Sequence, residues 1–109
     1  MNPESLSVVR MTGELDLLRR DEIGAMLRVT GPRPPMLVDL SEVTYADSSV
    51  LAELLRFHGE AKRHGVRVAL VIASRQFARL VQYAGLGQAF HIFNSIDAAR
   101  DFCEHGTGS

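Results

Sequence analysis

The chain has 109 residues, of which 46% are hydrophobic and 23% charged, and its formal net charge is −1. This balance is typical of one globular domain with one core and excludes a disordered chain. With so little net charge, and with Lys and Arg scattered along the sequence, no positive field gathers nucleic acid. No segment approaches the roughly 20 apolar residues of a membrane span, and residues 1–8 do not resemble a signal peptide. We therefore expect a cytoplasmic protein without direct membrane contact.

The first half of the chain predicts two strands with a helix between them. Residues 5–12 alternate in part and are rich in β-branched side chains, which favours a strand that ends at Gly13. Residues 17–29 carry apolar side chains at helical spacing. Residues 36–40 form a short apolar run after several prolines, which predicts a buried, central strand. The segment 41–49 is then expected to be a loop.

Residues 50–62 predict the clearest helix of the chain. Its apolar face is expected to hold Leu51, Leu54, Leu55 and His58, and its polar face Glu53, Arg56 and Glu60. The following residues, 67–73, are a nearly continuous run of apolar side chains and predict another buried strand. The alternation of strand and helix therefore continues past the middle of the chain.

The remaining residues complete the pattern. Ser74 is expected to cap a helix, residues 89–93 to form a short strand, and Ser95 to cap the last helix. Strands and helices that alternate in this way predict an α/β fold, with about four helices on a mostly parallel sheet of four strands, or five. We expect residues 1–105 to form this one domain and residues 106–109 to be a flexible tail.

The segment before the clearest helix is the candidate functional site. Asp47, Ser48 and Ser49 can each cap a helix, and such a triplet is more often only a cap. Partners of parallel sheets nevertheless meet the loops at the carboxyl ends of the strands. A phosphate on serine at a helix N-terminus is stabilised by about 0.3–1 kcal/mol, so phosphorylation would alter docking without unfolding the domain.

Other residues do not predict catalysis, a cofactor or a metal site. His58 and His64 are six residues apart and lie on different helix faces, and the other two histidines belong to separate elements. Ser48 has no adjacent base to activate it as a nucleophile. The single cysteine, Cys103, stands beside Phe102 and predicts a buried structural thiol. We therefore predict that the protein is not an enzyme.

Three segments together resemble the STAS domain family, especially the bacterial anti-anti-sigma factors, also called anti-sigma factor antagonists. These segments are residues 12–16 (TGELD), residues 37–51 (LVDLSEVTYADSSVL) and residues 83–86 (YAGL). The second segment is specific at its length, whereas the first and third would be weak alone. Their shared order and spacing carry the resemblance over nearly the whole chain.

The resemblance implies a function and a site. A member of this family binds an anti-sigma factor that is also a serine kinase, which releases a sigma factor and activates transcription. The kinase phosphorylates Ser48, or alternatively Ser49, to switch the domain off, and a PP2C-type phosphatase acts on the phosphorylated form. Asp47 is expected to position the Ser48 hydroxyl. The implied partner-binding residues are Gly13, Glu14, Asp16, Asp47, Ser48, Ser49 and Val50.

The sequence departs from the family pattern in two places. Val50 stands where the family usually has glycine. Its bulk is expected where a partner's backbone approaches, so it could impair phosphorylation by the kinase. Relatives commonly begin with an additional edge strand, for which few residues remain here. Two alternative functions also stay open: a STAS subunit of a lipid-transport ABC complex, and a structural STAS protein of a stress-signalling assembly.

Overall fold

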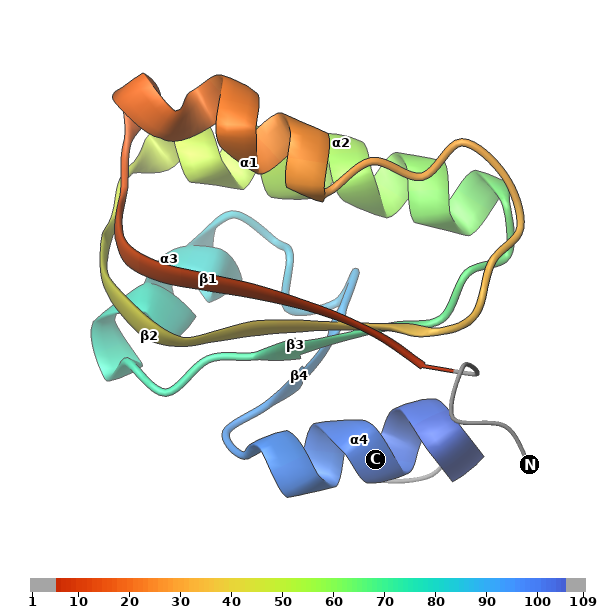
Figure 1. The fold of residues 1–109 in the computed structure, drawn as a ribbon. Helices are drawn as coiled ribbons and strands as arrows, with labels where there is room; N and C mark the ends of the chain where they lie inside the picture. Colours follow the sequence, from red (N-terminus) through yellow and green to blue (C-terminus); the bar gives the residue numbers. More distant parts are fainter. Residues whose placement is uncertain (1–5, 106–109) are drawn as a thin grey trace.

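The computed structural model describes residues 6–105, which alternate between parallel strands and helices (Figure 1). The strands are β1 (Ser7–Leu15), β2 (Met36–Ala46), β3 (Val68–Val71) and β4 (His91–Phe93). The helices are α1 (Arg20–Met26), α2 (Ser48–Arg63), α3 (Arg75–Tyr83) and α4 (Ile96–His105), and a short 3-10 helix, η2 (Leu17–Arg19), precedes α1. This confirms the predicted α/β class with four helices and a four-stranded parallel sheet. The predicted tail, residues 106–109, lies outside the described residues.

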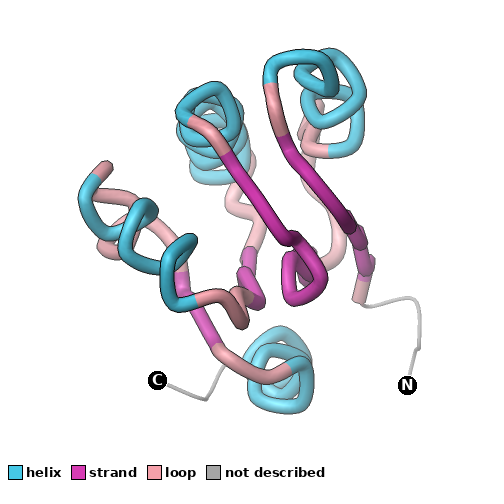
Figure 2. Tube along the Cα trace, turned by 90° about the vertical axis from the view of Figure 1, so that its left-hand side faces the viewer, coloured by secondary structure: helices cyan, strands magenta, loops and turns pink. Residues whose placement is uncertain are grey.

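The strands follow one another across the sheet in chain order, β1-β2-β3-β4, and every neighbouring pair is parallel. Right-handed crossovers between successive strands bring the connecting helices to one face of such a sheet. In agreement, residues of α1, α2 and α3 share one core cluster. The last helix, α4, packs on the opposite face against β2, β3 and β4 (Figures 1 and 2).

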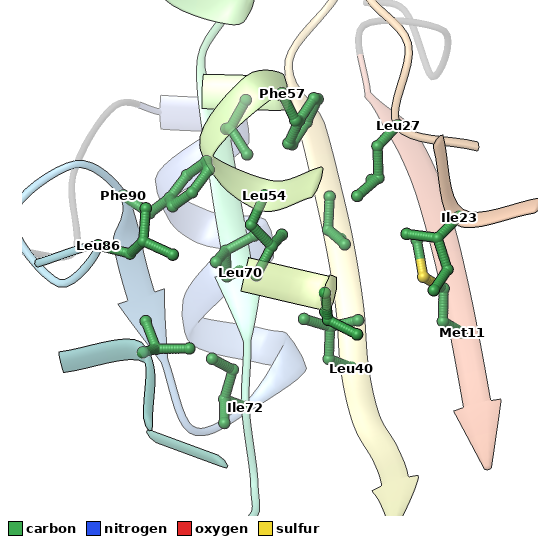
Figure 3. Close-up of a cluster of buried hydrophobic side chains, with 14 of the residues drawn as sticks. Met11, Ile23, Leu27, Leu40, Leu54, Phe57, Leu70, Ile72, Leu86 and Phe90 are labelled. Carbon is green, nitrogen blue, oxygen red and sulfur yellow. The ribbon is translucent and has the colours of Figure 1, made fainter. Parts of the chain in front are cut away.

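Both faces of the central strands are therefore buried. In β2, Met36, Val38 and Leu40 pack toward α1–α3, whereas Leu37 joins the cluster under α4. This two-sided burial explains why β2 begins as a continuous apolar run. Figure 3 shows the larger cluster, in which side chains of α2 lie over β2 and β3. Cys103 is buried in the smaller cluster, as predicted, and burial raises the pKa of its thiol.

Two boundaries predicted in the first half were wrong. Gly13 does not end the first strand, because β1 continues through it to Leu15, with Gly13 at φ +79° beside an irregularity in the pairing. A glycine inside a strand often marks such a bulge. Residues 41–46 are strand and not loop, because β2 continues to pair with β1 as far as Ala46. Of the expected loop only Asp47 remains between the two elements, because Ser48 and Ser49 already belong to α2.

The first helix is shorter than predicted. Residues 17–19 form η2, and the regular helix runs only from Arg20 to Met26. Leu17 and Leu18, which are among the apolar side chains at helical spacing in residues 17–29, are exposed. These two leucine side chains therefore lie on the surface and not in the core.

The predicted buried face of α2 was also partly wrong. Leu55 is 59% exposed, whereas Glu53 is buried together with Val50, Leu54, Phe57 and Ala61. The Glu53 carboxylate can be buried because Arg20 Nε and Arg56 Nε donate to it at 3.0 and 3.1 Å. Since Arg20 comes from α1, only the packing of two helices could place Glu53 inward.

The predicted serine caps were correct. The Ser74 hydroxyl accepts a bond from the Phe77 amide at the start of α3, and the Ser95 hydroxyl accepts one from the Ala98 amide at the start of α4. Both bonds are 3.2 Å long. Each satisfies an amide that the helix itself leaves unpaired.

Candidate partner-binding site

The candidate site lies where β1 and β2 end side by side. Leu15 pairs with Ala46 in the parallel register, and the Asp47 amide donates to the Leu15 carbonyl at 3.2 Å. Asp16 and Asp47 therefore lie side by side, directly after the carboxyl ends of two neighbouring strands. We call residues 13–16 together with residues 47–49 the Asp47 site.

Both aspartates of the site cap helices. The Asp16 carboxylate accepts a bond from the Leu18 amide at 3.1 Å at the start of η2. The Asp47 carboxylate accepts bonds from the Ser49 amide at 2.9 Å and the Ser49 hydroxyl at 2.5 Å at the start of α2. The Ser49 hydroxyl is the main cause that lowers the pKa of Asp47, and backbone amides, including that of Leu17, add to it.

The two serines of the site differ in environment. Ser48 is the first residue of α2, is exposed, and has no hydrogen-bond partner for its hydroxyl among residues 6–105. Ser49 is half-buried and donates its hydroxyl to Asp47. Asp47 thus holds the Ser49 hydroxyl and not the Ser48 hydroxyl, which differs from the role expected for it. The hydroxyl group that remains free to react or to contact a partner is that of Ser48.

Val50 does not belong to the surface of the site. Its side chain is 1% exposed and packs in the larger core cluster. The Val50 side chain, which was expected to contact a partner, offers no exposed surface in this structure, because it points inward from the first turn of α2. The same placement removes its bulk from the path of an approaching backbone.

The irregular part of β1 at residues 12–14, which we call the Gly13 turn, is held by Arg19, a residue that no sequence pattern indicated. Arg19 Nη1 donates to the Thr12 carbonyl at 2.8 Å and to the Glu14 carbonyl at 2.9 Å, so the guanidinium joins the residues on both sides of Gly13. Glu22 in turn orients the guanidinium, with Arg19 Nε 3.1 Å from its carboxylate. Arg19 could not be found by spacing alone, because its partners are backbone carbonyls of β1.

Exposed apolar side chains flank the site on both sides. On one side, Leu18 in η2 is 93% exposed. On the other side, Tyr83 is 89% exposed and lines a groove of about 300 Å³ between the end of β2 and α3. The groove is lined by Tyr45, Ala46, Gln76, Phe77, Arg79, Leu80 and Tyr83. Exposed aromatic residues beside a polar centre are typical of protein interfaces.

The site offers hydrogen bonding and charge but no metal site. Within residues 6–105, no group of three or more His, Cys, Asp or Glu side chains could hold a metal ion. In the same part of the chain, no helix combines the length and the apolar character needed to cross a bilayer. The chemistry that the site presents is an unpartnered hydroxyl at a helix N-terminus, beside the carboxylates of Asp47 and Asp16.

Three solved structures share this fold at low sequence identity. An anti-sigma factor antagonist from Mycobacterium paratuberculosis has a TM-score of 0.79 and 23% identity, with 95% of this chain and 90% of that chain covered. SpoIIAA, a Bacillus cell fate determinant solved in its phosphorylated form, has a TM-score of 0.66 and 23% identity, with 93% of both chains covered. A sulfate transporter family protein from Wolinella succinogenes has a TM-score of 0.77 and 17% identity, with 95% of this chain and 88% of that chain covered.

The sequence match extends the likeness beyond the fold. The family model described as "Mlab, STAS domain" matches residues 2–94, which is most of the chain. The matched residues include β1 and β2, the starts of η2 and α2, and both aspartates of the Asp47 site. The chain belongs to the STAS domain family.

Proposed function

We propose that this protein is an anti-sigma factor antagonist that binds a serine-kinase anti-sigma factor through the Asp47 site and is released when Ser48 is phosphorylated. The observation that carries the proposal is the contrast between the two serines: Ser48 is exposed and unpartnered within the described residues, whereas Ser49 is bonded to Asp47. An anti-sigma factor antagonist and a phosphorylated SpoIIAA among the structural neighbours support it.

The start of α2 can carry a phosphate without loss of the fold. A dianion on Ser48 would stand at the start of α2, where the helix dipole favours negative charge. It would also stand beside the Asp47 carboxylate, which already holds its charge strongly because its pKa is lowered. Phosphorylation therefore concentrates negative charge at an exposed point, while the core below it stays unchanged.

The effect on binding is expected to be large. A partner that fits the free hydroxyl would have to accept a new dianion against its own surface, which costs several kcal/mol when that surface is acidic or apolar. About 3 kcal/mol already corresponds to more than a hundredfold in affinity. This difference is enough for a switch between a bound and a released state.

The surroundings of Ser48 provide contact area for such a partner. The turn at Gly13 and Glu14 lies beside it at the end of β1, and the groove at Tyr45 and Tyr83 lies beside it at the end of β2. An exposed tyrosine can act as an anchor because it buries a large apolar ring and keeps a polar end. In this scheme the chain supplies the docking surface, the partner supplies the catalysis, and both act in the cytoplasm.

Phosphate mapping with a candidate kinase tests the proposal. The wild type is expected to gain one phosphate from ATP, mapped to Ser48 by peptide mass spectrometry, and Ser48→Ala is expected to gain none. The Ser49→Ala variant should still be phosphorylated on Ser48, because the Ser49 hydroxyl is bonded to Asp47 and is not the proposed acceptor. A PP2C-type phosphatase should remove the phosphate. Phosphate found on Ser49 alone would contradict the assignment.

Binding by the same kinase gives an independent test. Ser48→Ala should bind like the wild type, whereas Ser48→Asp should bind more weakly by about tenfold or more, in the direction of the phosphorylated form. The fold of each variant is checked by circular dichroism. Equal affinity of the two variants would exclude charge at Ser48 as the control.

A second function is favoured by the neighbour from a transporter family. In that case the domain would be a constitutive subunit of a transport complex, such as a lipid-transport ABC complex. Co-purification with a membrane ATPase, together with binding unaffected by Ser48→Asp, would support this function over the first.

A further inference from the structure

We propose that a cleft at the opposite end of the sheet from Ser48 binds a small organic anion made of one acidic group on a flat ring. The cleft has a volume of about 250 Å³ and lies where the C-terminal half of α2 meets the beginnings of β3 and β4 and the helix α4. It is lined by His58, Ala61, Lys62, Val66, Arg67, Val68, Ala89, Phe90, His91 and Phe102. This inference does not depend on the function proposed for Ser48.

The charge of the cleft favours an anion. Four of its lining residues, His58, Lys62, Arg67 and His91, are basic, and none is acidic. Among residues 6–105, neither Lys62 nor Arg67 has a carboxylate within ion-pair distance. Two uncompensated positive charges at the rim of one cleft raise the local concentration of anions and can bond a carboxylate or phosphate directly.

The walls of the cleft favour a flat ring on that anion. The Arg67 guanidinium lies 5.6 Å from the centre of the Phe102 ring. The centre of the His91 ring lies 4.3 Å from the centre of the same Phe102 ring. On the other side, the rings of His58 and Phe90 are 5.3 Å apart between centres. Phe90 is seen in Figure 3 at the edge of the core, beside α2. Basic groups thus stand beside aromatic rings on both walls, an arrangement that suits a ligand with both a ring and a charge.

Arg67 is fixed in place by the backbone. Its Nη1 atom donates to the Cys103 carbonyl in α4 at 3.2 Å. A guanidinium has five donors, so this bond leaves others available for a ligand. Pre-organisation of this kind reduces the entropy lost on binding.

The size of the cleft limits the ligand. A cavity of about 150 Å³ is known to hold benzene, so about 250 Å³ holds one ring with a carboxylate or phosphate. Sites for drug-sized ligands begin at about 300 Å³, which makes a nucleotide too large. Lys62 is in the last turn of α2, about 21 Å along the helix axis from Ser48 at 1.5 Å per residue, so the cleft is separate from the Asp47 site.

A titration followed by two-dimensional amide NMR on the full chain tests the proposal. The probes are benzoate, which has the ring and the charge, acetate, which lacks the ring, and benzyl alcohol, which lacks the charge. Benzoate should give saturable shifts at the amides of residues 58–68 and 89–91, with a dissociation constant in the millimolar range for so small a ligand. Acetate and benzyl alcohol should each bind at least about tenfold more weakly.

Two matched variants distinguish the effect of a positive charge in the cleft from the effect of the protein's overall charge. Lys62→Gln removes a lining cation and should weaken benzoate binding by severalfold, whereas Arg63→Gln removes a cation next to it that does not line the cleft and should not. Both positions are exposed, so both variants should keep the wild-type spectrum elsewhere. The proposal is overturned by absence of saturable shifts at the cleft, by equal binding of benzoate and either comparator, or by equal losses in the two variants.

Discussion

Ser48 and Ser49 are neighbours of the same residue type, yet the start of α2 gives their hydroxyl groups different environments. Ser49 faces back toward the cap and bonds Asp47, whereas Ser48 faces solvent. The difference follows from the cap geometry, because the aspartate at the N-cap reaches the second helical residue and not the first. In the function proposed above, this one local hydrogen bond is what leaves Ser48, and not Ser49, as the acceptor of the phosphate.

The lowered pKa of Asp47 predicts a dependence of stability on pH. A carboxyl whose pKa is lower in the folded state stabilises the protein above its unfolded pKa, about 3.9, and this contribution is lost as pH falls through the folded pKa. Asp47→Asn keeps a capping side chain without this charge. We expect it to be less stable than the wild type near neutral pH, with the gap closing in acid.

Urea unfolding of both proteins at a series of pH values measures this gap. Ser49→Ala provides the control, because it removes the main cause of the shift and should bring the pKa of Asp47 back toward its ordinary value. A gap that stays constant between neutral and acidic pH would contradict the assignment.

Arg19 is expected to determine the rigidity of the Gly13 turn. Arg19→Met keeps the aliphatic stem but loses the bonds to the Thr12 and Glu14 carbonyls. We expect higher backbone mobility at Gly13 and Glu14, measured by NMR relaxation, and weaker binding of the partner proposed above. Arg75→Met, which changes an exposed arginine of α3, should leave the turn unchanged.

At the scale of elements, α1 and α2 approach closely at Gly24. A Cβ atom at this position would lie 3.1 Å from Glu53 Oε1, and Arg56 Nη2 donates to the Gly24 carbonyl at 3.3 Å. The carboxylate itself is held by arginines from both helices. The lack of a side chain at Gly24 therefore lets the ion pairs form between the helices.

Two glycine replacements test this explanation of the helix contact. Gly59→Ala, inside α2 with no atom within 4 Å of the added Cβ, should raise the unfolding free energy by about 0.5–1 kcal/mol. Gly24→Ala should give less of this gain, because Glu53 Oε1 must shift by a few tenths of an ångström within its ion pairs to make room for the Cβ atom. Urea unfolding of the two variants is the measurement, and equal gains would show that Gly24 has no packing role.

At the scale of the whole molecule, stability depends on a sheet that is covered on both faces. The central strands carry side chains with no exposed surface toward α1–α3 and toward α4. Ser48, by contrast, lies exposed at the end of the strands and belongs to neither cluster. The fold can thus tolerate a change of charge at Ser48, because no buried contact depends on it.

Truncation of a central core residue should be costly. Leu70→Ala in β3 removes a fully buried side chain (Figure 3) and should lower the unfolding free energy by about 2–5 kcal/mol. Leu55→Ala in α2 removes a largely exposed side chain and should change it by no more than about 0.5 kcal/mol. Denaturant unfolding monitored by circular dichroism compares them, and similar losses would contradict the burial assigned to Leu55.

Signals within short segments of the sequence were enough to predict the class of fold and the family. Hydrophobic periodicity and turn residues are local signals, so they placed four strands and four helices in the right order and located the caps at Ser74 and Ser95. The long segment from residue 37 to residue 51 was enough to indicate a STAS domain, which the family match confirms.

Packing between elements, by contrast, fixes which residues face inward and which hydroxyl is free. Val50 and Glu53 became buried because β1, α1 and α2 meet above the sheet, and β2 continued past its apolar run because β1 pairs with it. The free Ser48 hydroxyl, the Arg19 bonds and the basic cleft at Lys62 likewise depend on contacts between elements. Such contacts join residues far apart in the chain, and periodicity within one segment carries no record of them.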